Sequence, residues 1–145
     1  MAGEIQLNSV SLATESGGTV TLNSSTDIKG CLNASGSAPV YACRAWINFD
    51  GTSASIGSGR ANGNVSGVTD NGTGDYTITF STAMPDANYA VSALAKRPSS
   101  DSHQDIYCFF EKSTTLSTSS FRIAMRSAIN NAAKDGDVVC FSIFR

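Results

Sequence analysis

Short runs in which apolar and polar residues alternate constrain the fold of this chain more than any other feature. Residues 76–80 read Tyr-Thr-Ile-Thr-Phe, and residues 121–126 alternate in the same way. Successive side chains of a β-strand point to opposite faces, so this pattern is typical of a strand with one buried face. The alternation therefore predicts strands in both stretches.

Further strands and frequent turns extend this pattern along the chain. Four more stretches have strand-like composition, namely residues 45–49, 89–94, 106–110 and 138–144. Turn-forming residues separate the strands at Asp50-Gly51, Asn62-Gly63, Asp70-Asn71-Gly72 and Asp135-Gly136. Residues 127–134 are the one helix-compatible stretch, and we expect a loop there with at most one helical turn. Closely spaced strands joined by polar turns predict an all-β, antiparallel β-sandwich or barrel-like domain.

The last of these strands differs from the others in its composition. Residues 138–144 read Val-Val-Cys-Phe-Ser-Ile-Phe and are apolar at nearly every position. A strand of this kind is expected to be buried on both faces, either in the centre of the domain or against another chain.

The first thirty residues are β-prone but contain no aromatic residue. We expect residues 1–30 to form an extended N-terminal arm or small hairpin, because they lack the bulk for a core of their own. Residues 31–145 would then form the β-rich module. The apolar residues expected to anchor the arm are Ile5, Leu7, Val10, Leu12, Val20 and Leu22.

Charge and hydropathy argue against two classes of partner. Only 15% of the residues are charged and the net charge is −2, so no basic surface for nucleic acid is expected. The longest strongly apolar stretch, residues 138–144, is far shorter than the ~20 residues that cross a bilayer. The first residues carry neither a basic segment nor an apolar run, so we expect no signal peptide and no membrane insertion.

The cysteine and histidine content argues against a zinc site. The four cysteines, Cys31, Cys43, Cys108 and Cys140, form no C-x-x-C pair, and His103 is the single histidine. Cys108 and Cys140 lie in apolar stretches and are expected to be buried, reduced thiols. A disulfide between Cys31 and Cys43 remains an alternative.

No motif predicts catalysis or a cofactor. His103 lies in a polar loop, and the chain has no Gly-x-Ser-x-Gly elbow. Residues 70–75 lack the distal Glu of an EF-hand and are expected to form a β-hairpin loop. A glycosidase site with paired carboxylates stays open as an alternative, although no recognisable motif supports it.

Three segments together carry a resemblance to a known module. Residues 43–52 contain R-A-W-x-N-F-x-G-T, residues 63–80 contain N-V-S-x-x-T-D-N-G-T-G-D-Y-T, and residues 81–91 contain A-M-P-D-A-N-Y-x-V. This ordered set resembles the C-terminal module of bacteriophage and prophage tail-fibre and virion-appendage proteins. The resemblance covers about two-thirds of the chain, from Cys43 to the C-terminus.

The resemblance implies a β-rich virion domain that assembles as a homotrimer, and it does not imply catalysis. Such proteins often carry a long virion anchor and shaft before the module, whereas about forty residues precede it here. The chain is therefore expected to be either a small protein anchored by its N-terminal arm or the tip of a longer one.

Two sets of residues are candidates for the core and for recognition. The aromatic residues of the motifs are expected to stack in one core: Trp46, Phe49, Tyr76, Phe80 and Tyr89. Loops on a rigid β scaffold commonly carry recognition, and the most polar loops here are residues 98–105 and 129–135. The receptor-binding candidates in them are Ser99, Asp101, His103, Gln104, Asn130, Asn131 and Lys134.

Several functions fit these observations. The first is a tail-fibre or appendage domain that attaches the virion to a polysaccharide or protein on the host surface. The second is a trimeric capsid decoration protein that binds the major capsid protein through its arm. A small glycan depolymerase and a non-viral lectin-like module rank below these. The expected partners are further copies of the chain, other virion proteins and the host surface, and the expected location is the virion, assembled in the host cytoplasm.

Overall fold

A computed structural model describes residues 4–7, 10–22, 41–99 and 105–145. The described residues form strands and turns and no helix, so the all-β prediction is confirmed. Within these ranges there is accordingly no helix long and apolar enough to cross a membrane. The chain divides into two compact units, Met1–Tyr41 and Ala42–Arg145.

The N-terminal unit contains a three-stranded antiparallel sheet. Its strands are β1 (Glu4–Leu7), β2 (Val10–Ser16) and β3 (Thr19–Leu22), and β2 lies in the middle. Gly17 and Gly18 join β2 to β3 with φ of 61° and 80°, a left-handed conformation that glycine adopts without strain. The predicted anchoring residues lie in pairs on β1, β2 and β3: Ile5, Leu7, Val10, Leu12, Val20 and Leu22.

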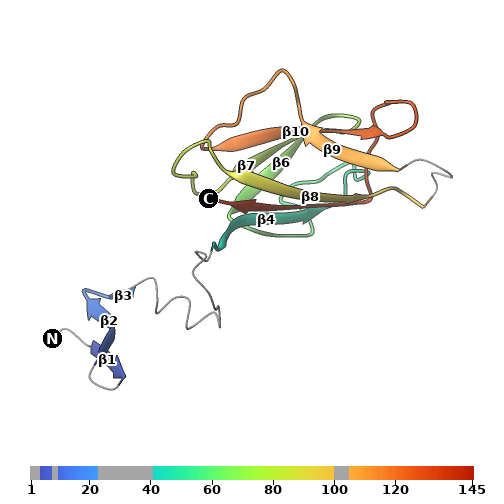
Figure 1. Cartoon of the computed structure of the whole chain (residues 1–145). Coiled ribbons are helices and arrows are strands. Elements are labelled where there is room, and N and C mark those ends of the chain that lie inside the picture. The colour runs from blue at the N-terminus through green and yellow to red at the C-terminus, as the bar shows by residue number, and fades with distance from the viewer. Residues whose placement is uncertain (1–3, 8–9, 23–40, 100–104) are drawn as a thin grey trace. The chain divides into compact units, whose positions relative to one another are not determined.

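The C-terminal unit is a sandwich of two four-stranded antiparallel sheets (Figure 1). The first, the β4 sheet, has the order β5 (Ala61–Gly63), β4 (Cys43–Phe49), β11 (Val138–Phe144) and β8 (Ala90–Lys96). The second, the β7 sheet, has the order β6 (Val65–Gly72), β7 (Asp75–Phe80), β10 (Ser120–Ser127) and β9 (Ile106–Phe110). In both sheets, neighbouring strands run antiparallel. The edge strands are β5 and β8 in the β4 sheet and β6 and β9 in the β7 sheet.

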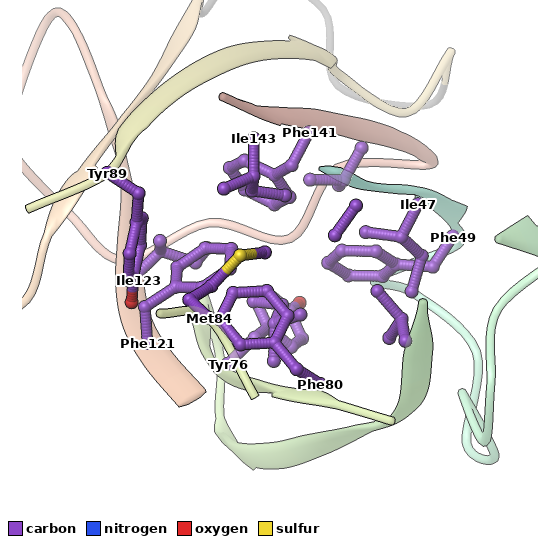
Figure 2. Close-up of a cluster of buried hydrophobic side chains, with 14 of the residues drawn as sticks. Ile47, Phe49, Tyr76, Phe80, Met84, Tyr89, Phe121, Ile123, Phe141 and Ile143 are labelled. Carbon is purple, nitrogen blue, oxygen red and sulfur yellow. The ribbon is translucent and has the colours of Figure 1, made fainter. Parts of the chain in front are cut away.

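The core fills the space between the two sheets, and Figure 2 shows its aromatic and aliphatic side chains facing one another. The alternation along β7 buries Tyr76, Ile78 and Phe80, and the same period operates along β10 and β11. Of the aromatic residues predicted for the core, four are buried, namely Phe49, Tyr76, Phe80 and Tyr89.

The prediction that Trp46 belongs to the core is wrong. Its neighbours Ala45 and Ile47 are buried, and the period of two along β4 therefore turns Trp46 to the outer face, where its side chain is 43% exposed. Gly63 of β5 lies against the indole, and a Cβ there would come within 2.4 Å of Trp46 Nε1.

Within the single chain β11 is buried on one face rather than two, and burial of its other face against another chain stays a prediction. Val139, Phe141 and Ile143 point into the core, whereas the alternate residues Val138 and Cys140 are only half-buried. β11 is nevertheless central in its sheet, since β4 and β8 pair with it on either side.

The β6–β7 connection is a tight hairpin, as the sequence predicts. Thr73 and Gly74 form the turn, and Gly74 has a φ of 67°. The Asp70 carboxylate accepts a 2.8 Å hydrogen bond from the Gly72 N–H, which closes the turn locally.

A buried tyrosine links this hairpin to two other loops. The Tyr76 hydroxyl lies 2.9 Å from the Gly51 carbonyl oxygen and also contacts the Asp135 carboxylate. The same carboxylate accepts a 2.6 Å hydrogen bond from the Gly74 N–H. Burial and the neighbouring Asp135 raise the pKa of Tyr76, so its hydroxyl stays a neutral donor. This network holds one end of the sandwich together.

The described cysteines are free thiols in two environments. Cys43 is exposed, whereas Cys108 and Cys140 are half-buried rather than fully buried as predicted. Burial raises the pKa of the Cys108 thiol to about 11. Cys31 lies outside the described residues, and so does the alternative of a Cys31–Cys43 disulfide.

Candidate binding surface

Two aromatic side chains lie next to each other on the outer face of the β7 sheet. Along the edge strand β9, Cys108 and Phe110 face the inner side, and the intervening Tyr107 and Phe109 point outward. The Tyr107 and Phe109 ring centroids are 5.4 Å apart with an angle of 32° between the ring planes. Tyr107 is 43% exposed, so this pair presents aromatic area to solvent.

An arginine from the neighbouring strand β10 lies beside these rings. Arg126 is directly opposite Tyr107 in the strand register. Its guanidinium carbon is 5.9 Å from the centroid of the Phe109 ring, within the range of a cation–π interaction. Arg126 Nη1 also donates a 3.2 Å hydrogen bond to the carbonyl oxygen of Asn131.

The loop that follows β10 supplies an amide to the same place. The Asn131 N–H donates a 3.0 Å hydrogen bond to the Ser127 carbonyl oxygen, which makes the single helical turn expected here. Asn131 has a φ of 57°, a left-handed conformation that asparagine tolerates better than most residues. Its Oδ1 accepts a 2.8 Å hydrogen bond from the Tyr107 hydroxyl. Tyr107, Phe109, Arg126 and Asn131 are called the aromatic surface below.

A saturated ion pair borders the aromatic surface on the outer face. Arg122 of β10 donates two hydrogen bonds to Asp75 of β7, at 2.7 and 2.5 Å. These bonds hold the pKa of Asp75 below its usual range, and Asn71 donates a further hydrogen bond to the carboxylate. Both charges are therefore already paired with each other.

The structure places the predicted receptor-binding residues in different positions. Asn131 belongs to the aromatic surface. Asn130 is exposed in the same loop, and its Oδ1 accepts a hydrogen bond from the Ala132 N–H. Lys134 is half-buried, and its backbone N–H donates to the Met125 carbonyl oxygen. Ser99 is exposed in a separate turn after β8. Asp101, His103 and Gln104 lie outside the described residues.

Sequence reasoning missed three of the four residues of the aromatic surface. Residues 106–110 read as an ordinary apolar strand, and the pattern does not say which face of it is buried. The available signal was that aromatic side chains occur at both the odd and the even positions of residues 106–110. In a strand with one buried face, one of these two sets must point away from the core. Arg126 lies opposite this strand and only the register identifies it as a neighbour.

An apolar groove of about 260 Å³ adjoins the aromatic surface. It lies between the edge strands β8 and β9, where Val91 and Ala93 face Cys108 and Phe110. Residues 90–95 of β8 and residues 106–110 of β9 contain neither proline nor a charged side chain, although the charged Lys96 ends β8 and Glu111 follows β9. Stretches of edge strand without such protection are prone to pair with other chains.

In the described ranges, no three His, Cys, Asp or Glu side chains gather as ligands for a metal ion. Comparisons of the whole chain with protein-family models, with curated proteins and with solved structures found no match.

Proposed function

We propose that this chain is a structural protein of a bacteriophage virion and that its C-terminal sandwich attaches the particle to the host surface. The observation that carries the proposal is the aromatic surface, in which two neighbouring rings, a guanidinium and an amide are fixed on a rigid scaffold. Aromatic rings pack against the apolar C–H faces of sugars and against apolar protein side chains, and the adjoining polar groups set orientation. The proposed activity is binding rather than catalysis.

The positions of the motif segments support this assignment. The R-A-W-x-N-F segment forms β4, and the N-V-S to T-G-D-Y-T segment forms the β6–β7 hairpin. These segments supply scaffold residues such as Phe49 and Tyr76. The aromatic surface lies on β9, β10 and the loop after it, outside the motif. A common scaffold with its recognition groups elsewhere is the arrangement expected of an attachment module.

Assembly as a homotrimer belongs to the same proposal. The apolar groove between the edge strands β8 and β9, and the uncharged residues 90–95 and 106–110 along them, support self-association. The separate N-terminal unit supports a role for Ile5, Leu7 and their neighbours in joining the virion. Three copies that engage one host surface bind with far higher avidity than one copy.

Labelling of intact virions with an antibody against the chain tests the function directly. We expect electron microscopy to show the label at the tail, and we expect the purified full chain to reduce phage adsorption when it is added to host cells first. Both results follow because the free chain would occupy the same receptors as the virion.

Two other outcomes would contradict attachment. Label spread over the head, with no inhibition of adsorption, would assign the chain to capsid decoration. Absence of the chain from the particle would exclude both virion functions. An antibody against the major capsid protein serves as the control for head labelling.

A further inference from the structure

Arg126 carries its positive charge on the aromatic surface without a salt bridge to any described residue. Among the described residues, the salt bridges join Arg60 to Asp50, Lys96 to Asp137, Arg122 to Asp75 and Arg145 to Asp86. None of them involves Arg126.

The contacts of Arg126 fix its side chain without neutralising its charge. Phe109 contributes a ring face, and the Asn131 carbonyl oxygen accepts from Nη1 only. Guanidinium has five N–H donors, so several remain available beside the rings. Arg126 lies close enough to Asp75 to help lower the pKa of that carboxyl group, but the two carboxylate oxygens of Asp75 accept their hydrogen bonds from Arg122.

Asn131 adds donors of the same kind. Its Oδ1 is occupied by the Tyr107 hydroxyl, which leaves the side-chain NH₂ for an external acceptor. The groups that converge beside the rings are therefore a positive charge without a salt bridge and an amide donor. Such a set favours a ligand that is rich in acceptors and negatively charged.

We propose that the ligand of the aromatic surface is an acidic saccharide, a proposal that rests on the attachment function above and names its receptor. The sugar ring packs on Tyr107 and Phe109, and its carboxylate or phosphate pairs with Arg126 and accepts from the Asn131 amide. A neutral sugar would leave the Arg126 charge without a salt bridge. An acidic protein segment could also pair with the positive charge of Arg126, and the experiment below distinguishes such a segment from an acidic saccharide.

The test measures binding of the full chain to acidic polysaccharide purified from the host surface. Four probes are compared: the native polysaccharide, a sample whose carboxylates have been reduced to alcohols, a dephosphorylated sample, and a sample treated in both ways. We expect one of the single treatments to weaken binding at least about tenfold, and that treatment identifies the anionic group.

Substitutions connect this charge dependence to Arg126. Arg126→Gln is expected to weaken binding of the native polysaccharide at least about tenfold and to leave binding of the neutralised sample unchanged. Arg126→Lys keeps the positive charge but loses the planar guanidinium that can donate two parallel hydrogen bonds. Its affinity for the native polysaccharide should therefore lie between those of Arg126→Gln and the wild type. Arg44→Gln removes an exposed arginine of the β4 sheet and is the matched control, with binding expected to stay at the wild-type level. Thermal unfolding of each variant checks that the sandwich remains folded.

Each remaining outcome overturns the proposal. Equal binding of the native and fully neutralised polysaccharide, or wild-type binding by Arg126→Gln, would show that the anionic group is not recognised here. Binding to cells that is lost after proteinase treatment, with no binding to any polysaccharide, would make the partner a protein while attachment still holds. Failure of the chain to bind host cells at all would instead remove the proposed function itself.

Discussion

Gly74→Ala is expected to lower the free energy of unfolding of the C-terminal sandwich by at least about 3 kcal/mol. Gly74 has a φ of 67°, and a Cβ there would lie 2.4 Å from the Met125 carbonyl oxygen and 2.8 Å from the Lys134 carbonyl oxygen. Both neighbours are backbone atoms, so relief requires movement of β10 or of the loop beside it. Such movement would also disturb the hydrogen bond from the Gly74 N–H to Asp135. Urea unfolding of the full chain measures the loss.

Gly57→Ala is the matched control for this substitution. Gly57 has a similar φ of 55°, but a Cβ there meets no atom within 4 Å. Its cost is therefore the conformational one alone, about 1–2 kcal/mol. Equal losses for the two variants would contradict the close packing of the hairpin turn against β10.

Phe121→Ala is expected to cost about 3–5 kcal/mol in the free energy of unfolding. Phe121 is 1% exposed, and its ring centroid lies 5.7 Å from that of Phe80 and 5.7 Å from that of Phe141. It therefore connects the β7 sheet with the β4 sheet at the centre of the core. The substitution removes the buried phenyl ring and leaves a cavity between the two sheets. The surrounding side chains belong to both sheets and cannot close this cavity without moving the sheets. Thermal or urea unfolding gives the value.

Phe110→Ala gives the comparison on the same sheet. Phe110 also contacts Phe121, with ring centroids 6.4 Å apart, but it is 45% exposed at the edge strand β9. We expect a loss of about 1 kcal/mol, since roughly half of its surface is already in water. A loss for Phe121→Ala no larger than this would mean that the two sheets do not share one packed core.

The alternation of residues predicted most of the scaffold. Residues 106–110 and 138–144 are strands with the predicted bounds, and residues 76–80 form most of β7. The strand Ala61–Gly63 was not predicted, because it has no large apolar side chain and forms only through pairing with β4. Pairing is a tertiary effect that local composition does not encode.

Trp46 shows where residue type misleads. A large aromatic side chain suggests the core, but the period of the strand, set by Ala45, Ile47 and Phe49, decides the face. The β11 strand shows the same limit, since Val138 and Cys140 are apolar yet lie outside the core.

The candidate site was predictable only in part. Asn131 could be chosen from the polarity of its loop. Tyr107, Phe109 and Arg126 could not, because their proximity depends on the pairing of β9 with β10. The register that brings Tyr107 opposite Arg126 is a property of the folded sheet.

The central claim is that the aromatic surface carries host attachment, and binding of fluorescently labelled full chain to host cells tests it most directly. Tyr107 and Trp46 are each 43% exposed, on the outer faces of opposite sheets, and form a matched pair for substitution. We expect Tyr107→Ala to weaken cell binding about thirtyfold, as loss of a central aromatic contact does, and Trp46→Ala to leave it unchanged. Wild-type binding by Tyr107→Ala, or a loss confined to Trp46→Ala, would contradict the assignment and move the attachment surface to the β4 sheet or elsewhere.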